Sequence, residues 1–355
     1  MKTLRIKDIC DKGSSNLKQK DVENQNGKYP VFGASGLIGN IDTYHQNKDY
    51  IAIVKDGSGI GRVSFMPAFS SVIGTLQYIL PKEGFNIKYI SYCLQSLDLA
   101  HYKQGAAIPH IYYRDYGEYE VNVEENPDDQ QRIVSYLDSG FEKIEAIKTN
   151  AANQLQAAKD MFQAALKELL TPKKGWSMKQ FGEVCDYHKV QDKWKDIPYI
   201  GLEHIEAHTG NLLGSINSNE VESSTFKFQQ GDVLYGRLRP YLQKVIIAPF
   251  DGCCSTEIFP IKSEIINHNY LKYWLLSDEV TTIMNESCSG CRMPRANMTD
   301  FRKQIISFPN QSEQFQIVNS LNRITQNIHS LEENYDQTIT LCNDLKQALL
   351  KKIFE

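Results

Sequence analysis

The sequence has little that would indicate a membrane protein, a secreted protein or a basic nucleic-acid-binding tail. No stretch approaches the roughly 18 consecutive apolar residues that a membrane-spanning helix requires. Residues 1–6 already begin to alternate between apolar and polar side chains, and they lack the apolar core of a secretion signal. The eight cysteines are scattered over 355 residues, which suits a reducing compartment better than a disulfide framework. We therefore expect a cytoplasmic protein that does not bind a membrane.

An excess of positive charge is also lacking. The chain has 39 Lys and Arg against 43 Asp and Glu, which gives a net charge of −4. The two signs stay close to balance in every segment of the chain, including both ends. Since DNA binding depends on where charge lies rather than on its total, a DNA contact would have to come from local clusters.

Catalytic motifs are scarce as well. The stretch KDGSGIGR, Lys55–Arg62, follows an apolar run and at first suggests a phosphate-binding loop. Its glycines lack the G-x-G-x-x-G spacing, it has no G-K-[ST] ending, and the next residues return as a strand. We therefore interpret it as a hairpin loop. The alternatives are a loop that presents its backbone N–H groups with Lys55, Ser58 and Arg62 to a phosphate backbone, and a nucleotide cofactor site.

Metal-binding patterns are incomplete. Cys288 and Cys291 with Cys253–Cys254 could supply four thiolates to zinc, but adjacent residues of a strand point to opposite faces. His204 and His208 are four residues apart without forming an H-E-x-x-H motif. The sequence also has no glycine-flanked serine elbow and no N-P-P-[FY] adenine-methylation motif. We expect a binding protein with no catalytic residue, no metal site and no cofactor on this chain.

What the sequence does contain is an internal duplication. Similar segments recur at a nearly constant offset of 184 or 185 positions, namely Gln131–Leu137 with Phe315–Leu321, Gln163–Leu170 with Gln347–Phe354, and Ile108–Tyr116 with Met293–Phe301. A period of this length is too long for a solenoid repeat and indicates two copies of a whole domain. The boundaries that follow are residues 1–126 and 176–310 for the two domains, with a helical segment after each, 127–175 and 311–355.

The two helical segments show sustained heptad patterning. Apolar residues recur at steps of three and four over about five heptads, which is typical of coiled-coil helices of roughly 60 Å each. The positions predicted to pair the helices or to bind a partner are Ile133, Leu137, Ile144, Leu155 and Phe162 in the first segment and Ile317, Leu321, Ile328, Leu345 and Leu349 in the second. A helical hairpin inside a single core is the alternative.

The domains between these helices have mixed α/β patterns. β-Branched and alternating stretches predict strands at Tyr50–Val54, Gly61–Phe65, Leu76–Leu80, Glu118–Val123, Ile197–Ile200, Val233–Tyr235, Lys244–Ala248, Glu257–Ile261 and Gln304–Phe308. Asn86–Leu97 and Asn269–Leu276 are predicted as short helices that their first residues cap. The expected fold class is therefore α+β.

Clusters of arginine, asparagine and aromatic residues occur at matching places in the two copies. Arginine and asparagine suit bidentate contacts to guanine and adenine. The candidate DNA-binding residues of the second copy are Arg237, Arg239, Tyr241, Lys244, Arg292, Arg295 and Asn297, and those of the first copy, besides the glycine-rich loop, are His110, Tyr112, Tyr113 and Arg114. The alternative is that these are ordinary polar loops with aromatic packing.

Taken in order, these features resemble a known family. The motifs that carry the resemblance are Tyr29–Gly39, Ile53–Ser58 and Gln130–Val134 in the first copy and Tyr199–Ile205, Gly236–Leu242 and Cys254–Glu257 in the second. The chain resembles the specificity subunit of a type I restriction-modification system over nearly its whole length. The resemblance implies two target-recognition domains alternating with two long helices that pair as an antiparallel coiled coil.

The resemblance also implies a function. Each domain would read one half of a split site in double-stranded DNA, and the paired helices would fix the spacer and dock two methyltransferase subunits that carry S-adenosylmethionine. Two translocase-nuclease subunits could join, and this chain would perform no chemistry. Because the loops of the two copies differ, we expect two unrelated half-sites. The alternatives are a recognition subunit of a type IIB-like enzyme and a coiled-coil scaffold that does not bind DNA.

Overall fold

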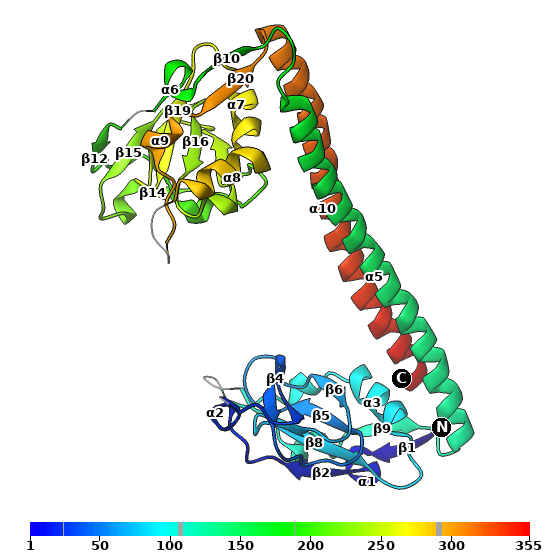
Figure 1. Cartoon of the computed structure of the whole chain (residues 1–355). Coiled ribbons are helices and arrows are strands. Elements are labelled where there is room, and N and C mark those ends of the chain that lie inside the picture. Colours follow the sequence, from blue (N-terminus) through cyan, green and yellow to red (C-terminus); the bar gives the residue numbers. More distant parts are fainter. Residues whose placement is uncertain (24, 106–108, 188, 289–292) are drawn as a thin grey trace. The chain divides into compact units, whose positions relative to one another are not determined.

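The computed structural model describes the chain except residues 24, 106–108, 188 and 289–292 (Figure 1). The chain divides into two compact units, Met1–Ala151 with Asp336–Glu355, and Ala152–Tyr335. Each unit holds one mixed α/β domain and one part of each of two long helices. None of the described helices is both long and apolar enough to cross a membrane.

The described residues of the first unit form three small sheets. β1 (Lys2–Arg5) pairs antiparallel with β9 (Glu120–Val123). A four-stranded sheet has the order β2 (Cys10–Ser14), β8 (Leu76–Pro81), β5 (Tyr50–Val54) and β6 (Val63–Met66), and a three-stranded sheet has the order β4 (Gly36–Ile41), β3 (Tyr29–Gly33) and β7 (Ser71–Val72). The helical elements are α1 (Ile6–Ile9), α2 (Gln19–Val22), α3 (Ile87–Ser96), η1 (Leu99–Tyr102) and α4 (Tyr113–Tyr116).

The apolar pattern explains how this domain packs. All five residues of β5 are buried, as expected for a central strand with an unbroken apolar sequence. Asn86 precedes α3 and caps it, since its side chain accepts hydrogen bonds from the N–H groups of Lys88 and Tyr89, which confirms the predicted cap. The buried face of α3 packs on β5, β6 and β8 and forms one core with the long helices of this unit.

The second unit repeats this plan with additions. β10 (Ser177–Gln180) pairs with β20 (Ile305–Phe308), and a four-stranded sheet has the order β11 (Asp186–Tyr187), β19 (Ile258–Lys262), β16 (Val233–Gly236) and β17 (Val245–Ile247). A five-stranded sheet has the order β12 (Gln191–Asp192), β15 (Thr225–Phe228), β18 (Gly252–Cys254), β13 (Pro198–Ile200) and β14 (Ile216–Asn217). The helical elements are α6 (Phe181–Val184), η2 (Leu202–His204), η3 (Ser218–Glu220), η4 (Pro240–Leu242), α7 (His268–Leu275), α8 (Asp278–Glu286) and α9 (Met298–Phe301).

The structure confirms the duplication. The sheet β2-β8-β5-β6 of the first unit and the sheet β11-β19-β16-β17 of the second have the same antiparallel strand order. α4 and α9 occupy positions 185 residues apart, and the long helices α5 (Pro127–Leu170) and α10 (Gln311–Phe354) start 184 residues apart and are both 44 residues long. The offsets found in the sequence therefore correspond to equivalent elements.

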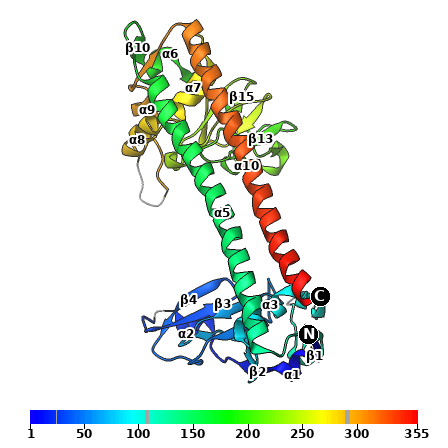
Figure 2. The ribbon, with the colours of Figure 1, turned by 90° about the vertical axis from the view of Figure 1, so that its right-hand side faces the viewer.

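The long helices pair antiparallel within each unit (Figures 1 and 2). In the first unit, Lys148 of α5 donates a 2.9 Å hydrogen bond to Asn343 of α10, and the Lys346 ammonium lies 4.8 Å from the centre of the Phe141 ring. In the second unit, the Lys159 ammonium lies 2.8 Å from the Glu332 carboxylate. In the two contacts of the first unit, the higher residue number of α5 is paired with the lower residue number of α10. The two helices therefore run antiparallel, which confirms the antiparallel coiled coil predicted from the sequence.

One of the positions predicted to pair the helices or to bind a partner does not lie in the helix–helix contact. Leu137, Ile144, Phe162, Ile317 and Leu321 are buried, and Ile133, Leu155, Ile328 and Leu349 are half-buried. Leu345, however, is 48% exposed. The inward positions step from Cys342 to Lys346 and then to Leu349, so Leu345 falls one residue outside the contact.

A second correction concerns the start of α7. The sequence pattern predicts the cap at Asn269, whereas the side chain of Asn267 accepts hydrogen bonds from the N–H groups of Asn269 and Tyr270. Two asparagines within one turn satisfy the same sequence signal, and only the backbone conformation decides between them. The predicted strands otherwise lie where the structure has them, within about two residues at each end.

Candidate nucleic-acid interface

The stretch Lys55–Arg62 is a hairpin loop between β5 and β6. The Val54 N–H donates to the Arg62 carbonyl at 3.0 Å, and the Gly61 N–H donates to the Val54 carbonyl at 2.8 Å. Gly57, Gly59 and Gly61 all have φ values above +80°, a conformation that favours glycine. A Cβ atom on Gly61 would lie 2.6 Å from the Ala100 nitrogen. The glycines therefore close a tight turn, which confirms the hairpin interpretation.

This hairpin is joined to a second loop that carries other predicted residues. The Gly57 N–H donates to the Pro109 carbonyl at 3.0 Å, and the Ile111 N–H donates to the Lys55 carbonyl at 2.9 Å. The His110 ring also hydrogen-bonds the Asp56 carboxylate through Nδ1. The two loops therefore form one unit, which we call the first loop pair, residues 55–62 and 109–114.

Aromatic and cationic side chains stack on this loop pair. The His110 and Tyr112 ring centres are 4.0 Å apart, and the Arg114 guanidinium lies 4.5 Å from the centre of the Tyr112 ring. Tyr112 and Arg114 are exposed, while the Lys55 ammonium lies 3.6 Å from the Asp56 carboxylate. A row of His, Tyr and Arg in reach of solvent can contact phosphates, sugars or base edges.

Three other predicted residues of the first copy are placed differently. Ser58 is exposed at the tip of the hairpin, and Arg62 is exposed with its guanidinium donating to the Ala34 carbonyl. Tyr113 belongs to the domain core instead, because its hydroxyl donates to the Cys10 carbonyl at 2.6 Å. Burial raises the pKa of Tyr113 to about 12. The packing of the domain is therefore sufficient to explain why a tyrosine stands at position 113.

The second copy has the same main-chain connection between two loops. The Ala296 N–H donates to the Arg237 carbonyl at 2.9 Å, and the Arg239 N–H donates to the Pro294 carbonyl at 2.7 Å. These two bonds correspond to those of Ile111 with Lys55 and of Gly57 with Pro109. We call residues 237–244 and 293–297 the second loop pair. Lys55 thus matches Arg237, Gly57 matches Arg239, and His110 matches Arg295.

A single carboxylate holds two arginines of the second loop pair. Arg237 Nε donates to Glu257 Oε2 at 2.9 Å, and Arg295 Nε donates to Glu257 Oε1 at 2.8 Å. The Arg237 guanidinium also lies 5.4 Å from the centre of the Phe259 ring. Acid–base contacts therefore tie the two loops together in both copies. In the first copy Asp56 contacts His110, and in the second Glu257 contacts both Arg237 and Arg295.

Arg239 and Tyr241 project from a strained turn. Arg239 has φ +52° and ψ 64°, a left-handed conformation that costs a non-glycine residue about 1–2 kcal/mol. Both side chains are exposed on either side of Pro240, which is buried. A non-glycine residue held in a strained backbone conformation is often found in functional loops.

The remaining residues predicted for the second copy have structural partners or fall outside the description. The Lys244 ammonium donates to the Leu202 carbonyl at 2.6 Å. Asn297 caps α9 by accepting hydrogen bonds from the N–H groups of Thr299 and Asp300. Arg292 lies outside the described residues.

The cysteines and histidines with incomplete metal-binding patterns are not arranged as a metal site in the part of the chain that the structure describes. Cys253 and Cys254 are buried, and burial raises the pKa of both thiols. Cys291 lies outside the described residues, whose His, Cys, Asp and Glu side chains form no group of three that could hold a metal ion. His204 and His208 hydrogen-bond the Gly201 N–H and the Gln243 side chain instead.

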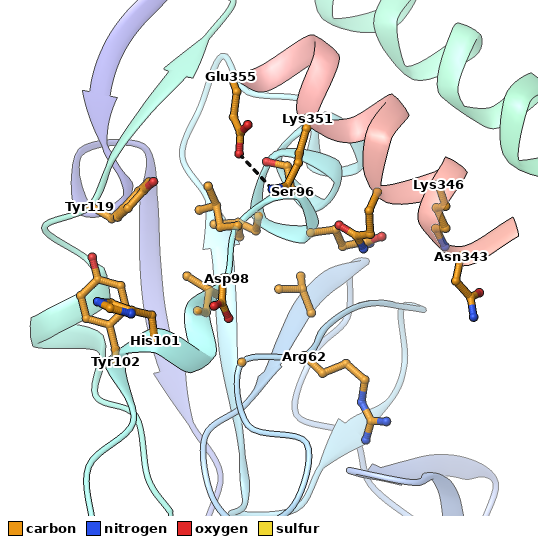
Figure 3. A pocket seen from close by; sticks show the side chains of 17 residues that line it. Arg62, Ser96, Asp98, His101, Tyr102, Tyr119, Asn343, Lys346, Lys351 and Glu355 are labelled. Atoms are coloured by element: carbon orange, nitrogen blue, oxygen red, sulfur yellow. Dashed lines mark ion pairs between the residues drawn. The ribbon is translucent and has the colours of Figure 1, made fainter. Parts of the chain in front are cut away.

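A pocket of about 870 Å³ lies where α3 and η1 meet the last turns of α10 (Figure 3). The labelled side chains that line it are Arg62, Ser96, Asp98, His101, Tyr102, Tyr119, Asn343, Lys346, Lys351 and Glu355. Its charges are of both signs, and the Lys351 ammonium lies 3.8 Å from the Glu355 carboxylate. Because these charges largely cancel, the pocket adds little to a surface for DNA.

Asp56 and Glu257 belong to the candidate interface, although no cluster of basic residues in the sequence points to them. An acidic side chain taken alone would repel DNA, so a search for cationic clusters passes over it. Their positions in the sequence could have indicated them, since Asp56 directly follows Lys55 and Glu257 is the last residue of the motif Cys254–Glu257. Both carboxylates contact a predicted DNA-binding residue.

The duplicated domains and the paired helices also occur together in a known family. A model of the type I restriction modification DNA specificity domain matches residues 1–157 and again residues 166–341. The chain belongs to this type I restriction-modification DNA specificity family. The family is one of DNA recognition, and membership confirms the resemblance drawn from the sequence. It does not favour the type IIB-like or scaffold alternatives.

Individual members of the specificity family are similar over almost the whole chain. The type I restriction enzyme EcoDI specificity subunit of Escherichia coli is 24% identical, over 99% of this chain and 87% of the relative. A chain from a structure of type I restriction-modification complex assembly and conformational transition has a TM-score of 0.72 at 16% identity, covering 99% and 96% of the two chains. The HsdS subunit from Thermoanaerobacter tengcongensis has a TM-score of 0.52 at 15% identity, covering 99% and 95%. The two solved structures share the fold.

Proposed function

We propose that this chain gives a type I restriction-modification complex its DNA sequence specificity. Each domain reads one part of a two-part site in double-stranded DNA. The observation that supports this most directly is the loop pair, which is built twice with the same main-chain hydrogen bonds and different side chains. Two loop pairs that share a backbone arrangement but carry different exposed side chains are suited to reading two different DNA sequences.

The first loop pair offers Lys55, His110, Tyr112 and Arg114, whereas the second offers Arg237, Arg239, Tyr241 and Arg295. Contacts to phosphates place a protein on the duplex, and contacts to base edges determine the sequence. The second set has three arginines, which favour guanine in the major groove. We therefore expect the two half-sites to differ.

The paired helices α5 and α10 act as the spacer and as the docking surface for two methyltransferase subunits. Met161 and Leu345 are 57% and 48% exposed, and they lie 184 positions apart at equivalent places of the two helices. Two equivalent apolar side chains on the surface suit two copies of the same partner. The partner subunits would bind S-adenosylmethionine and methylate adenine, translocase-nuclease subunits could join them, and this chain would supply binding only.

The test is to produce this chain together with the methyltransferase subunit of its own system and to map methylated adenine by long-read sequencing. We expect a single motif with two defined parts and an undefined spacer of fixed length. A gel-shift selection from random duplexes with the purified complex should enrich the same motif. Methylation without a two-part motif, or a selection that enriches no sequence, would refute the proposal.

A further inference from the structure

We propose that Glu257 is a positioning residue that aims Arg237 at a guanine in the second half-site, with Arg295 as its support. This inference rests on the proposed function and assigns a base and a reading residue to one of its two half-sites.

The geometry leaves a defined edge of Arg237 for DNA. The Glu257 carboxylate accepts a hydrogen bond from the Nε of each arginine, at 2.9 Å from Arg237 and at 2.8 Å from Arg295. Among the described residues the two Nη atoms of Arg237 have no hydrogen-bond partner, whereas Nη1 of Arg295 donates to the Met293 carbonyl at 3.4 Å. The terminal pair of Nη groups matches the O6 and N7 acceptors of guanine.

Arg237 is also held by the sheet. Its N–H donates to the Glu257 carbonyl at 2.9 Å, directly beyond the pairing of Gly236 with Ile258 in β16 and β19. The Phe259 ring packs 5.4 Å from the guanidinium. Carboxylate, main chain and ring therefore fix one side chain on a rigid element, as reading a base edge requires.

The two arginine side chains are more exposed to solvent than the carboxylate that holds them. The side chains of Arg237 and Arg295 are 31% and 39% exposed, and that of Glu257 is 21% exposed. Two cations and one anion leave the cluster with one positive charge. Glu257 thus lowers the general attraction to phosphates while it orders the guanidinium, so it favours discrimination between sequences over affinity for any DNA.

The experiment compares wild type with Glu257→Gln in the intact complex with its methyltransferase subunit. Affinity is measured for the complete site and for duplexes in which each base pair of the second half-site is changed in turn. We expect discrimination at one guanine to fall by about tenfold or more, as for a lost bidentate arginine contact. Affinity for unrelated DNA should stay the same or rise, because a negative charge has been removed.

Two further variants separate positioning from a general structural role. Arg237→Lys keeps the charge and loses the planar fork, so it should lose discrimination at the same guanine. The double variant should lose no more than either single one, because Glu257 acts through Arg237. Glu264→Gln is the matched control, since Glu264 is exposed in the same domain and has no ion-pair partner among the described residues. It should bind as wild type does.

The outcomes that overturn the inference are distinct from failure of the proposed function. An equal loss at every base pair together with a lower melting temperature would show that Glu257 only holds the fold. A second half-site without guanine on either strand would also overturn it. Should Glu257→Gln fail to fold, 7-deazaguanine is placed at each guanine of that half-site, and wild-type affinity should drop at one position. Affinity unchanged at all positions would be contrary evidence. If the wild-type complex shows no two-part motif, the proposed function itself fails.

Discussion

The main-chain N–H of Asn86 donates a 2.6 Å hydrogen bond to the side-chain Oε1 of Gln130. Gln130 lies in the first turn of α5 and is fully buried, and its Nε2 donates to the carbonyls of Gly84 and Glu124. One side chain therefore joins the start of the long helix to the start of α3. In the second copy Gln314 accepts from the Asn267 N–H at 2.7 Å and donates to the carbonyls of Ile265 and Pro309.

Replacing either glutamine should destabilise its own unit. Gln314→Leu leaves a buried N–H and two carbonyls without partners, and we expect the free energy of unfolding to fall by about 1–3 kcal/mol. Urea unfolding followed by circular dichroism measures this. Gln316→Leu is the control, because Gln316 is exposed two residues further along α10. Equal stability of the two variants would contradict the assignment.

Arg239→Ala should weaken or relax recognition of the second half-site. If Arg239 contacts a guanine, the loss is about 1–3 kcal/mol at that base. The measurement is the methylation motif of the variant complex, together with its affinity for duplexes altered in each half-site. An unchanged motif would exclude Arg239 from recognition.

Arg239→Gly separates the side chain from its backbone strain. Both Arg239→Ala and Arg239→Gly remove the side chain, but glycine adopts φ +52° without the steric cost that alanine has. We expect the glycine variant to be more stable than the alanine variant by up to about 1 kcal/mol, because added freedom of the unfolded chain offsets part of the gain. A less stable glycine variant would show that the turn carries no strain.

These residues show what the sequence could and could not predict. Matching Ile133 to Ile317 located equivalent elements because a duplication preserves length even where side chains change. The position of Leu345 could not be predicted, since a small drift of the heptad turns an apolar residue outward. The Glu257 contacts were also hidden, because they join residues 20 and 38 positions apart through loops whose path has no periodic signal.

Asp138→Asn should lower stability in a pH-dependent way. Asp138 accepts hydrogen bonds from Lys88, at 2.6 Å, and from Tyr92. Desolvation tends to raise the pKa of Asp138, but the Lys88 and Tyr92 hydrogen bonds outweigh it, so the pKa lies below its usual value. The stabilisation is therefore complete above about pH 4, the usual value for an unfolded chain, and is lost as the pH falls through the folded pKa.

The measurement is the urea midpoint of wild type and variant between pH 7 and pH 3. We expect the difference between them to shrink toward the acid end. Glu142→Gln, on an exposed position of the same helix, is the control and should unfold like wild type throughout. A difference that grows as the pH falls would contradict the role of the Asp138 carboxylate.

Met161→Glu and Leu345→Glu should each weaken docking of a methyltransferase subunit while the chain remains folded. Both side chains are exposed, so the substitutions leave the core intact and place a charge in the proposed interface. Co-purification should fall from two partner subunits to one for each single variant. Thr149→Glu is the control, because Thr149 is exposed about a third of a turn around α5 from Met161. Retention of two partner subunits by both variants would place the docking surface elsewhere.

Inserting seven residues in both long helices should lengthen the spacer of the methylated motif. One heptad after Ala151 and one after Tyr335, where the two compact units meet in the sequence, keeps the helix–helix contact in phase. The added length of about 10 Å corresponds to about three base pairs. The heptad in α5 alone should instead reduce stability. A motif with its original spacing after the double insertion would show that the helices do not set the spacer.

Each loop pair is closed in part by hydrogen bonds between main-chain atoms, Ile111 with Lys55 in one copy and Ala296 with Arg237 in the other. Main-chain groups are the same in every amino acid except proline, so the outward side chains can be exchanged while the frame stays intact. Selection can then change which sequence is read without first restoring stability. A host lineage could acquire a new methylation pattern from a few substitutions in one domain while the other half of its target stays as it was.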